Sequence, residues 1–226
     1  MLTKVLIFCA GNGHRWGEYM GVRKHFVNID GEFLLDRTIR LCRQLGAYRV
    51  VVNGPMYNAM YKRQDAEHVE LDIVSNEDHH KHTVDKCTNS ISQWNSAGRT
   101  VCLLGDVFYE ESALEEILLS KHSTFVDYSR ANRSHMTGKP WGEDFACSFY
   151  PSDHGKIKEI LESFVQGGAS PWLTVAKEFQ DFDNKPHRVE LGGFTEDFDY
   201  PHDYDRWLEH RCKYKNECGQ VHAIGE

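Results

Sequence analysis

Short apolar runs alternate along the chain with longer stretches in which apolar residues recur at helical spacing. After Lys4, every residue up to Cys9 is apolar, which predicts a strand buried on both faces. Similar runs predict further strands at residues 48–53, 69–74, 100–104, 123–128 and 145–150. The stretches between and after them predict helices at residues 33–45, 83–94, 113–119, 154–165, 175–179 and 201–210.

Strands without alternation, separated by helices, are typical of a mostly parallel sheet with helices on both faces. We therefore predict an α/β fold, a single Rossmann-like three-layer sandwich with a mostly parallel central sheet. Residues 1–226 contain no repeat, long linker or composition break, so we predict one domain. Gly46 is expected to end the first helix, and Ser112 with Glu115 to form a capping box at the start of the third.

Composition excludes several classes of protein. Of the 226 residues, 40% are hydrophobic and 12% aromatic, which excludes a disordered chain. The net charge of −8 argues against binding to a nucleic-acid backbone. No stretch approaches the roughly 18 apolar residues of a membrane span. The 7 cysteines are odd in number and scattered through apolar segments, which favours a reducing, cytoplasmic setting. We expect no nucleic-acid or membrane partner, and whether the chain forms a homodimer stays open.

A glycine-rich loop, Ala10-Gly11-Asn12-Gly13, follows the first predicted strand and leads to Arg15. Glycines let backbone amides approach a ligand and surround an anion, and ligands of open α/β sheets bind at the carboxyl ends of strands. A dinucleotide fingerprint would need glycine at position 16, and a phosphate loop of the Walker type would end in Gly-Lys-Ser/Thr; neither is present. Together with Arg15 and Lys24, the loop suits a triphosphate, although a simple tight turn is an equally plain interpretation of the glycines.

An acidic residue, Asp106, follows the predicted strand at residues 100–104. This placement directs its carboxylate toward the same edge of the sheet as the glycine-rich loop. Carboxylates together with phosphate oxygens are the ligands that Mg²⁺ prefers, so Asp106 is a candidate magnesium ligand. The alternative is a turn or capping role, which is common for aspartate after a strand.

The order of Ala10-Gly-x-Gly-x-Arg15, Lys24 and the segment at residues 30–38 resembles the opening of the nucleotidyltransferase-like family. That family includes sugar-phosphate nucleotidylyltransferases and cytidylyltransferases. Arg23 stands where the family has proline before its lysine, and Glu32-Phe33 replaces the residues before Leu-Leu. The resemblance implies a GT-A-like α/β fold of the nucleotide-diphospho-sugar transferase type.

The resemblance also implies roles for individual residues. Asp106 matches the family's metal-binding aspartate, and Asp199 matches the second metal ligand in a late Asp-x-Asp-Thr-Pro segment, with Asp197 as the alternative. Nucleotide contacts are implied for the backbone of the loop and for a short stretch further on, namely Ala10, Gly11, Asn12, Gly13, Thr83 and Asp85. The region that faces the acceptor in the family contains here Arg130, Arg133, Lys139, Trp141 and Glu143, for which surface-loop positions are an equally good interpretation.

These features predict an Mg²⁺-dependent nucleotidyltransferase. It would transfer a nucleoside monophosphate from a nucleoside triphosphate to a phosphorylated small molecule, such as a sugar phosphate, and release pyrophosphate. Arg15 would hold the β- and γ-phosphates and Lys24 the α-phosphate. Two alternatives remain. One is a GT-A-type glycosyltransferase that uses a nucleotide-sugar, although Asp106-Val-Phe108 lacks the Asp-x-Asp pattern. The other is a non-catalytic nucleotide-binding protein.

Overall fold

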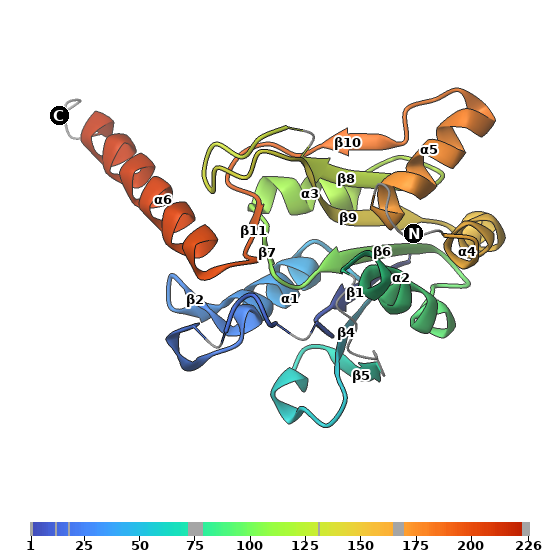
Figure 1. Ribbon diagram of the computed structural model, residues 1–226, viewed down its shortest axis with the longest axis horizontal. Helices are drawn as coiled ribbons and strands as arrows, with labels where there is room; N and C mark the ends of the chain where they lie inside the picture. Colours follow the sequence, from blue (N-terminus) through green and yellow to red (C-terminus); the bar gives the residue numbers. More distant parts are fainter. Residues whose placement is uncertain are drawn as a thin grey trace.

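The computed structural model describes residues 2–11, 13–17, 19–71, 79–130, 132–164 and 170–222. Its centre is a seven-stranded sheet in the order β10-β8-β9-β6-β1-β4-β5 (Figure 1). The strands of this sheet are β1 (Thr3–Phe8), β4 (Arg49–Pro55), β5 (Glu67–Leu71), β6 (Arg99–Leu104), β8 (Val126–Arg130), β9 (Glu143–Phe149) and β10 (Arg188–Glu190). β1 pairs in parallel with β4 and β6, whereas β9 runs antiparallel between β6 and β8. The predicted α/β fold with a mostly parallel sheet is confirmed.

Helices cover both faces of the sheet. The side chains of β1 point alternately to the two faces and contact helices on each. Val5 and Ile7 pack in one core cluster with buried residues of α1 (Leu34–Gln44) and α3 (Glu111–Leu119). Leu6 and Phe8 pack in a second cluster with α2 (His79–Asn89), α4 (His154–Glu162) and α5 (Pro171–Asp183). The uninterrupted apolar run of the first strand therefore has a physical reason, since each face of the sheet contacts helices.

Helix ends test the predicted caps. Gly46 directly follows the C-cap residue of α1, adopts φ +85° and donates its N–H to the carbonyl of Arg43, so the predicted C-terminal glycine is confirmed. The predicted capping box at Ser112 is wrong. α3 begins two residues earlier than predicted, at Glu111, and its N-cap residue Glu110 makes no side-chain capping hydrogen bond, which places Ser112 inside the first turn.

Several element boundaries differ from the sequence prediction. The strand predicted at residues 69–74 begins at Glu67, and residues 72–78 lie outside the described part of the chain. The helix predicted to start at residue 83 begins at His79 and ends at Asn89, where a separate 3₁₀ turn follows. The last helix, α6 (Pro201–His222), continues well beyond residue 210. Among the described residues, no helix is long and apolar enough to cross a bilayer.

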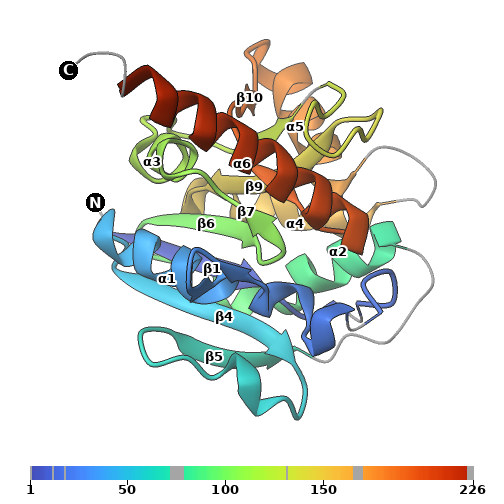
Figure 2. The same cartoon turned by 90° about the vertical axis from the view of Figure 1, so that its left-hand side faces the viewer.

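Four two-residue strands were not predicted, because two residues show no periodicity: β2 (Asn28–Ile29), β3 (Glu32–Phe33), β7 (Val107–Phe108) and β11 (Glu196–Asp197). β7 and β11 pair antiparallel, with Asp197 opposite Val107. Beyond this pair, the N–H of Phe198 donates to the carbonyl of Asp106 at 3.0 Å. The late segment that leads into α6 is therefore fixed beside the end of β6. Figure 1 shows β7 and β11 side by side, and Figure 2 shows the molecule from the side where α6 faces the viewer.

Candidate active site

The glycine-rich loop begins where β1 ends. The N–H of Cys9 still donates to the carbonyl of Asn53 at the end of β4, after which the chain leaves the sheet. Gly13 adopts φ +66°, and its carbonyl accepts the N–H groups of Trp16 and Gly17, at 3.0 and 3.3 Å. This turn requires the positive φ that glycine adopts without steric cost, and Arg15 lies within it. Asn12, a predicted nucleotide contact, lies outside the described residues.

Trp16 explains why position 16 is not glycine. Its side chain is only 2% exposed, and its indole N–H donates to the carbonyl of Val22 at 2.8 Å. The ring also meets Tyr19 and Tyr204 edge to face. Trp16 thus attaches the loop to the segment before Lys24 and to α6.

Four predicted site residues come together beyond the carboxyl ends of β1 and β6. The ammonium of Lys24 forms an ion pair with Oδ2 of Asp106 and lies 3.6 Å from Oδ1 of Asp199. The guanidinium of Arg15 lies 3.0 Å from the same Asp199 oxygen. The two cations therefore meet the two carboxylates in one group, although the four residues come from separate parts of the chain.

Charge pairing sets the ionisation of this group. Burial alone would raise the pKa of Asp106, but the ammonium of Lys24 and the further positive charge nearby, including Lys86, together outweigh burial and hold that pKa well below its usual range. Burial likewise opposes the charge of Lys24, yet Asp106 and Asp199 raise its pKa above the usual value. Lys24 and Asp106 are therefore both charged at neutral pH.

The start of α6 holds Asp199 in place. One carboxylate oxygen of Asp203, Oδ2, accepts the backbone N–H groups of Asp199 and Tyr200, at 3.2 and 2.9 Å. The guanidinium of Arg15 also lies over the ring of Tyr200, 5.4 Å from its centroid. Asp203, in the first turn of α6, therefore fixes the backbone beside it.

A second buried cation, Lys139, lies among four carboxylates. Its Nζ is 2.6 Å from Asp197, 3.5 Å from Asp199 and Asp203, and 3.6 Å from Glu143. Burial opposes its charge, but Asp197 and then Asp199 raise the pKa of Lys139 well above the usual value. Burial and the neighbouring Glu143 raise the pKa of Asp197. Arg15 and Lys24 also pair with Asp199, so with Asp106 included three cations face five carboxylates. The joined group therefore still attracts a further cation or proton.

Two groups of carboxylates could hold a metal ion, and both contain Asp199. Asp106 and Asp199 already share one cation, the ammonium of Lys24, which demonstrates that a positive charge fits between them. Ligand oxygens of Glu143, Asp197 and Asp199 lie within 4.8 Å of one another. Carboxylate oxygens are hard donors and suit Mg²⁺. Asp197, the alternative ligand, lies deeper, and one of its oxygens is bonded to Lys139.

The other residues predicted on the acceptor side differ in burial and in their partners. Arg130 is fixed by a buried ion pair with Glu196, whereas Arg133 is exposed. Trp141 is 58% exposed, and its indole N–H donates to Glu143 at 2.6 Å. Trp141 and Glu143 therefore connect the surface to the cluster around Lys139.

Helix α2 carries the two predicted nucleotide contacts that lie away from the loop. Asp85 is half-buried, and the side chain of Thr83 lies outside the part of the structure that is described. The sequence did not single out Lys86, the next residue. A β-carbon placed on Gly11 would lie 3.9 Å from Nζ of Lys86, so this ammonium approaches the glycine-rich loop.

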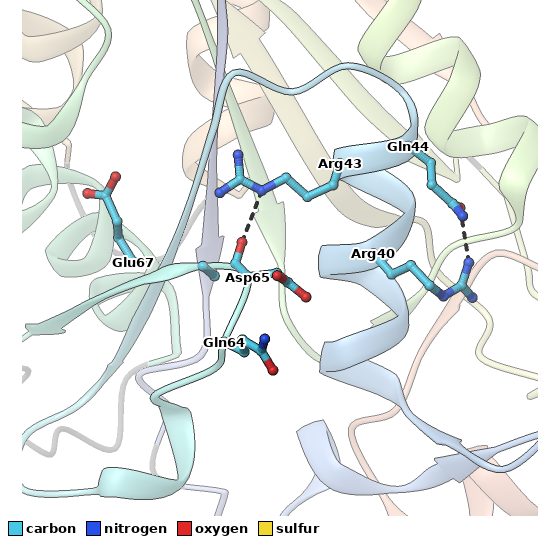
Figure 3. A pocket seen from close by; sticks show the side chains of 7 residues that line it. Arg40, Arg43, Gln44, Gln64, Asp65 and Glu67 are labelled. Atoms are coloured by element: carbon cyan, nitrogen blue, oxygen red, sulfur yellow. Dashed lines mark hydrogen bonds between the residues drawn. The ribbon is translucent and has the colours of Figure 1, made fainter.

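A surface groove of about 620 Å³ lies away from these residues, between the end of α1 and the start of β5 (Figure 3). Its arginines already have partners. Arg43 donates to the carbonyl of Asp65, and Arg40 bonds to Gln44 and to Glu32. Both arginines among the described residues that line this groove are therefore engaged within the protein.

Comparison with known proteins gives a family match and a fold match. The family model described as "MobA-like NTP transferase domain" matches residues 5–141. No curated protein matches the chain in sequence.

Solved structures share the fold at low sequence identity. The phosphocholine cytidylyltransferase of Streptococcus pneumoniae is 14% identical with a TM-score of 0.62, over 92% of this chain and 99% of that one. A UDP-glucose pyrophosphorylase in complex with UDP-glucose is 11% identical with a TM-score of 0.67, over 94% and 100%. The inositol-1-phosphate CTP transferase of T. maritima is 14% identical with a TM-score of 0.62, over 92% and 95%.

Proposed function

Because the chain belongs to the MobA-like NTP transferase domain family, we propose that it transfers a nucleoside monophosphate from a nucleoside triphosphate to a phosphorylated small molecule and releases pyrophosphate. The chain is an enzyme of the nucleotidyltransferase class. The observation that carries the finer proposal is the meeting of Arg15, Lys24, Asp106 and Asp199 beyond one edge of the sheet.

In this proposal each charged residue acts on a different part of the triphosphate. The amides of the loop and the guanidinium of Arg15 bind the β- and γ-phosphates, which leave together as pyrophosphate. The ammonium of Lys24 binds the α-phosphate and stabilises the negative charge that builds there as the acceptor attacks. An acceptor phosphate is already an anion, so the reaction needs no strong general base. Catalysis then depends on position and charge.

Asp106 and Asp199 would hold Mg²⁺, with Asp203 fixing the backbone at Asp199. The bound ion would screen the repulsion between the two anionic substrates. Lys24, which contacts both carboxylates, would stabilise the negative charge that develops on the α-phosphate beside them.

The proposed acceptor is a phosphorylated small molecule, and the proposed compartment is the cytoplasm. The names of two structural neighbours contain phosphocholine and inositol-1-phosphate, so both belong in an acceptor panel beside sugar phosphates. Cys9, Cys42, Cys87, Cys102 and Cys147 are free and buried, which favours the reducing cytoplasm.

The test is pyrophosphate release from each of the four nucleoside triphosphates with Mg²⁺ and this panel. We expect release with one acceptor class, its loss on chelation of Mg²⁺, and recovery when Mg²⁺ is restored. Hydrolysis of a nucleotide-sugar without pyrophosphate release would instead favour the glycosyltransferase alternative. Nucleotide binding without either reaction would contradict the proposed catalysis.

A further inference from the structure

Lys86 of α2 lies near the glycine-rich loop, and the family motif assigns it no role. Its neighbour Cys87 is buried in the core with Leu6 and Phe8 of β1, which fixes α2 against that face of the sheet. Adjacent residues of a helix point about 100° apart. Lys86 can therefore leave the core and approach Gly11, which lies just beyond the end of β1.

The surroundings of Lys86 differ from those of the other cations in the site. Arg15, Lys24 and Lys139 each form an ion pair with at least one carboxylate. Among the described residues, no carboxylate lies within ion-pair distance of Lys86, which is half-buried. Burial lowers its pKa, the more distant Asp106 partly offsets this effect, and Lys24 adds repulsion. A sheltered ammonium without a paired anion is unfavourable unless a ligand supplies the anion.

We propose that Lys86 binds the α-phosphate of the nucleoside triphosphate, on the α2 side of the site. This inference rests on the proposed function and adds a substrate-binding residue to it. Lys86 approaches Gly11 at the beginning of the loop and interacts electrostatically with Asp106, the proposed metal ligand. In the proposed complex, the phosphate bound between Gly11 and Asp106 is the α-phosphate, at which transfer takes place. Arg15 lies further along the loop and takes the phosphates that leave.

The experiment measures binding in the presence of Mg²⁺ for a nucleoside, its monophosphate and its triphosphate, using the base that binds most tightly. The proteins are the wild type, Lys86→Met, Lys86→Arg, and the matched control Lys177→Met on the exposed face of α5. A lost charge-assisted hydrogen bond predicts that Lys86→Met weakens binding of the monophosphate and the triphosphate by about tenfold or more. Nucleoside binding should be unchanged, and Lys86→Arg should restore most of the phosphate-dependent affinity.

An equal loss for the nucleoside would contradict the proposal, since it would indicate a structural or base-contacting role. A loss confined to the triphosphate, or no loss, would also overturn it. Thermal unfolding checks that the variants fold, and Lys86→Gln replaces Lys86→Met if the latter does not. Wild-type binding without pyrophosphate release would refute the proposed function, while the binding series would still decide the role of Lys86.

Discussion

One ammonium group, that of Lys24, contacts the two carboxylates on which the proposed chemistry depends. Neither contact could be derived from spacing, because the three residues are far apart in sequence. Their types and order nevertheless match a family pattern, so motif comparison found them. The same approach did not find Lys86, nor did it show that Asp197, Asp199, Asp203 and Glu143 surround the ammonium of Lys139, since these groups meet only through long-range packing.

Replacing either partner of the Lys24–Asp106 pair should remove catalysis. We expect Lys24→Ala and Asp106→Ala each to lower turnover by about 10²-fold or more, the scale of a lost electrostatic contact in a transition state. Steady-state pyrophosphate release measures the effect. Lys158→Ala, on the surface of α4, is the control and should keep wild-type turnover. Full activity in both site variants would contradict the assigned roles.

His25, next to Lys24 in sequence, should make stability depend on pH. Its ring is buried, and Nδ1 lies 2.9 Å from the hydroxyl of Tyr61. Burial lowers the pKa of His25 from 6.5 to about 3. The unfolded chain therefore binds a proton that the folded chain does not, between those pH values. This contribution to stability is present above pH 6.5 and falls by about 1.4 kcal/mol per pH unit as the pH drops toward 3.

The measurement is chemical denaturation of wild type and His25→Gln from pH 7 to pH 4. We expect the stability of the wild type to fall more steeply than that of the variant as the pH is lowered. His122→Gln, at an exposed position, should follow the wild-type curve. Parallel curves for wild type and His25→Gln would show that the buried ring does not supply this pH dependence.

At the scale of elements, the close approach of two strand ends positions the first candidate metal ligand. The N–H of Gly105, just after β6, donates to the carbonyl of Phe8 at 3.0 Å. A β-carbon on Gly105 would lie 2.3 Å from Sγ of Cys9 and 3.0 Å from that carbonyl. Asp106 is the next residue, so the absence of a side chain at position 105 lets β6 end against β1.

Gly105→Ala should therefore be destabilising, by about 1–3 kcal/mol, the usual cost of overpacking. Gly155→Ala is the matched control, because no atom lies within 4 Å of its added β-carbon and the residue belongs to α4. Alanine there should leave stability unchanged or raise it by up to about 1 kcal/mol. Urea denaturation measures both. Equal stability of the two variants would contradict the close packing at Gly105.

The sequence predicted elements well where they are long and periodic, such as the strand after Lys4 and the helix that ends before Gly46. It failed where tertiary contacts decide. Nothing in the residues 107–108 or 196–197 predicts a strand, because each forms only by pairing with the other. The capping prediction at Ser112 failed because a suitable residue pair does not fix which residue starts the helix.

At the scale of the whole molecule, a third hydrophobic cluster joins the two ends of the chain. It contains Trp16 from the glycine-rich loop, Phe108 from β7, and Phe198 and Trp207 beside and within α6. The ring centroids of Phe108 and Trp207 are 4.5 Å apart, and the indole N–H of Trp207 donates to the carbonyl of Phe194 at 2.9 Å. This cluster supports both Asp199 and the turn that carries Arg15.

Trp207→Ala should accordingly affect both stability and activity. We expect a loss of about 3–5 kcal/mol of unfolding free energy, as for other buried aromatic residues, together with reduced turnover as Asp199 loses support. Phe182→Ala, where the ring is 81% exposed, should change stability by less than about 0.5 kcal/mol. Denaturation and pyrophosphate release measure the two effects. Unchanged stability in Trp207→Ala would show that the cluster is not a structural support.

The pairing of β7 with β11 also has a consequence for synthesis on the ribosome. The polypeptide emerges from its amino-terminal end, so β1, β4 and β6 are available to pair long before Asp199 is translated. A partly synthesised chain would display the loop, Lys24 and Asp106 without their late partner. Such a nascent chain could begin to fold but could not bring Arg15, Lys24 and Asp106 together with Asp199. The proposed active site would therefore form only after the segment before α6 had left the exit tunnel.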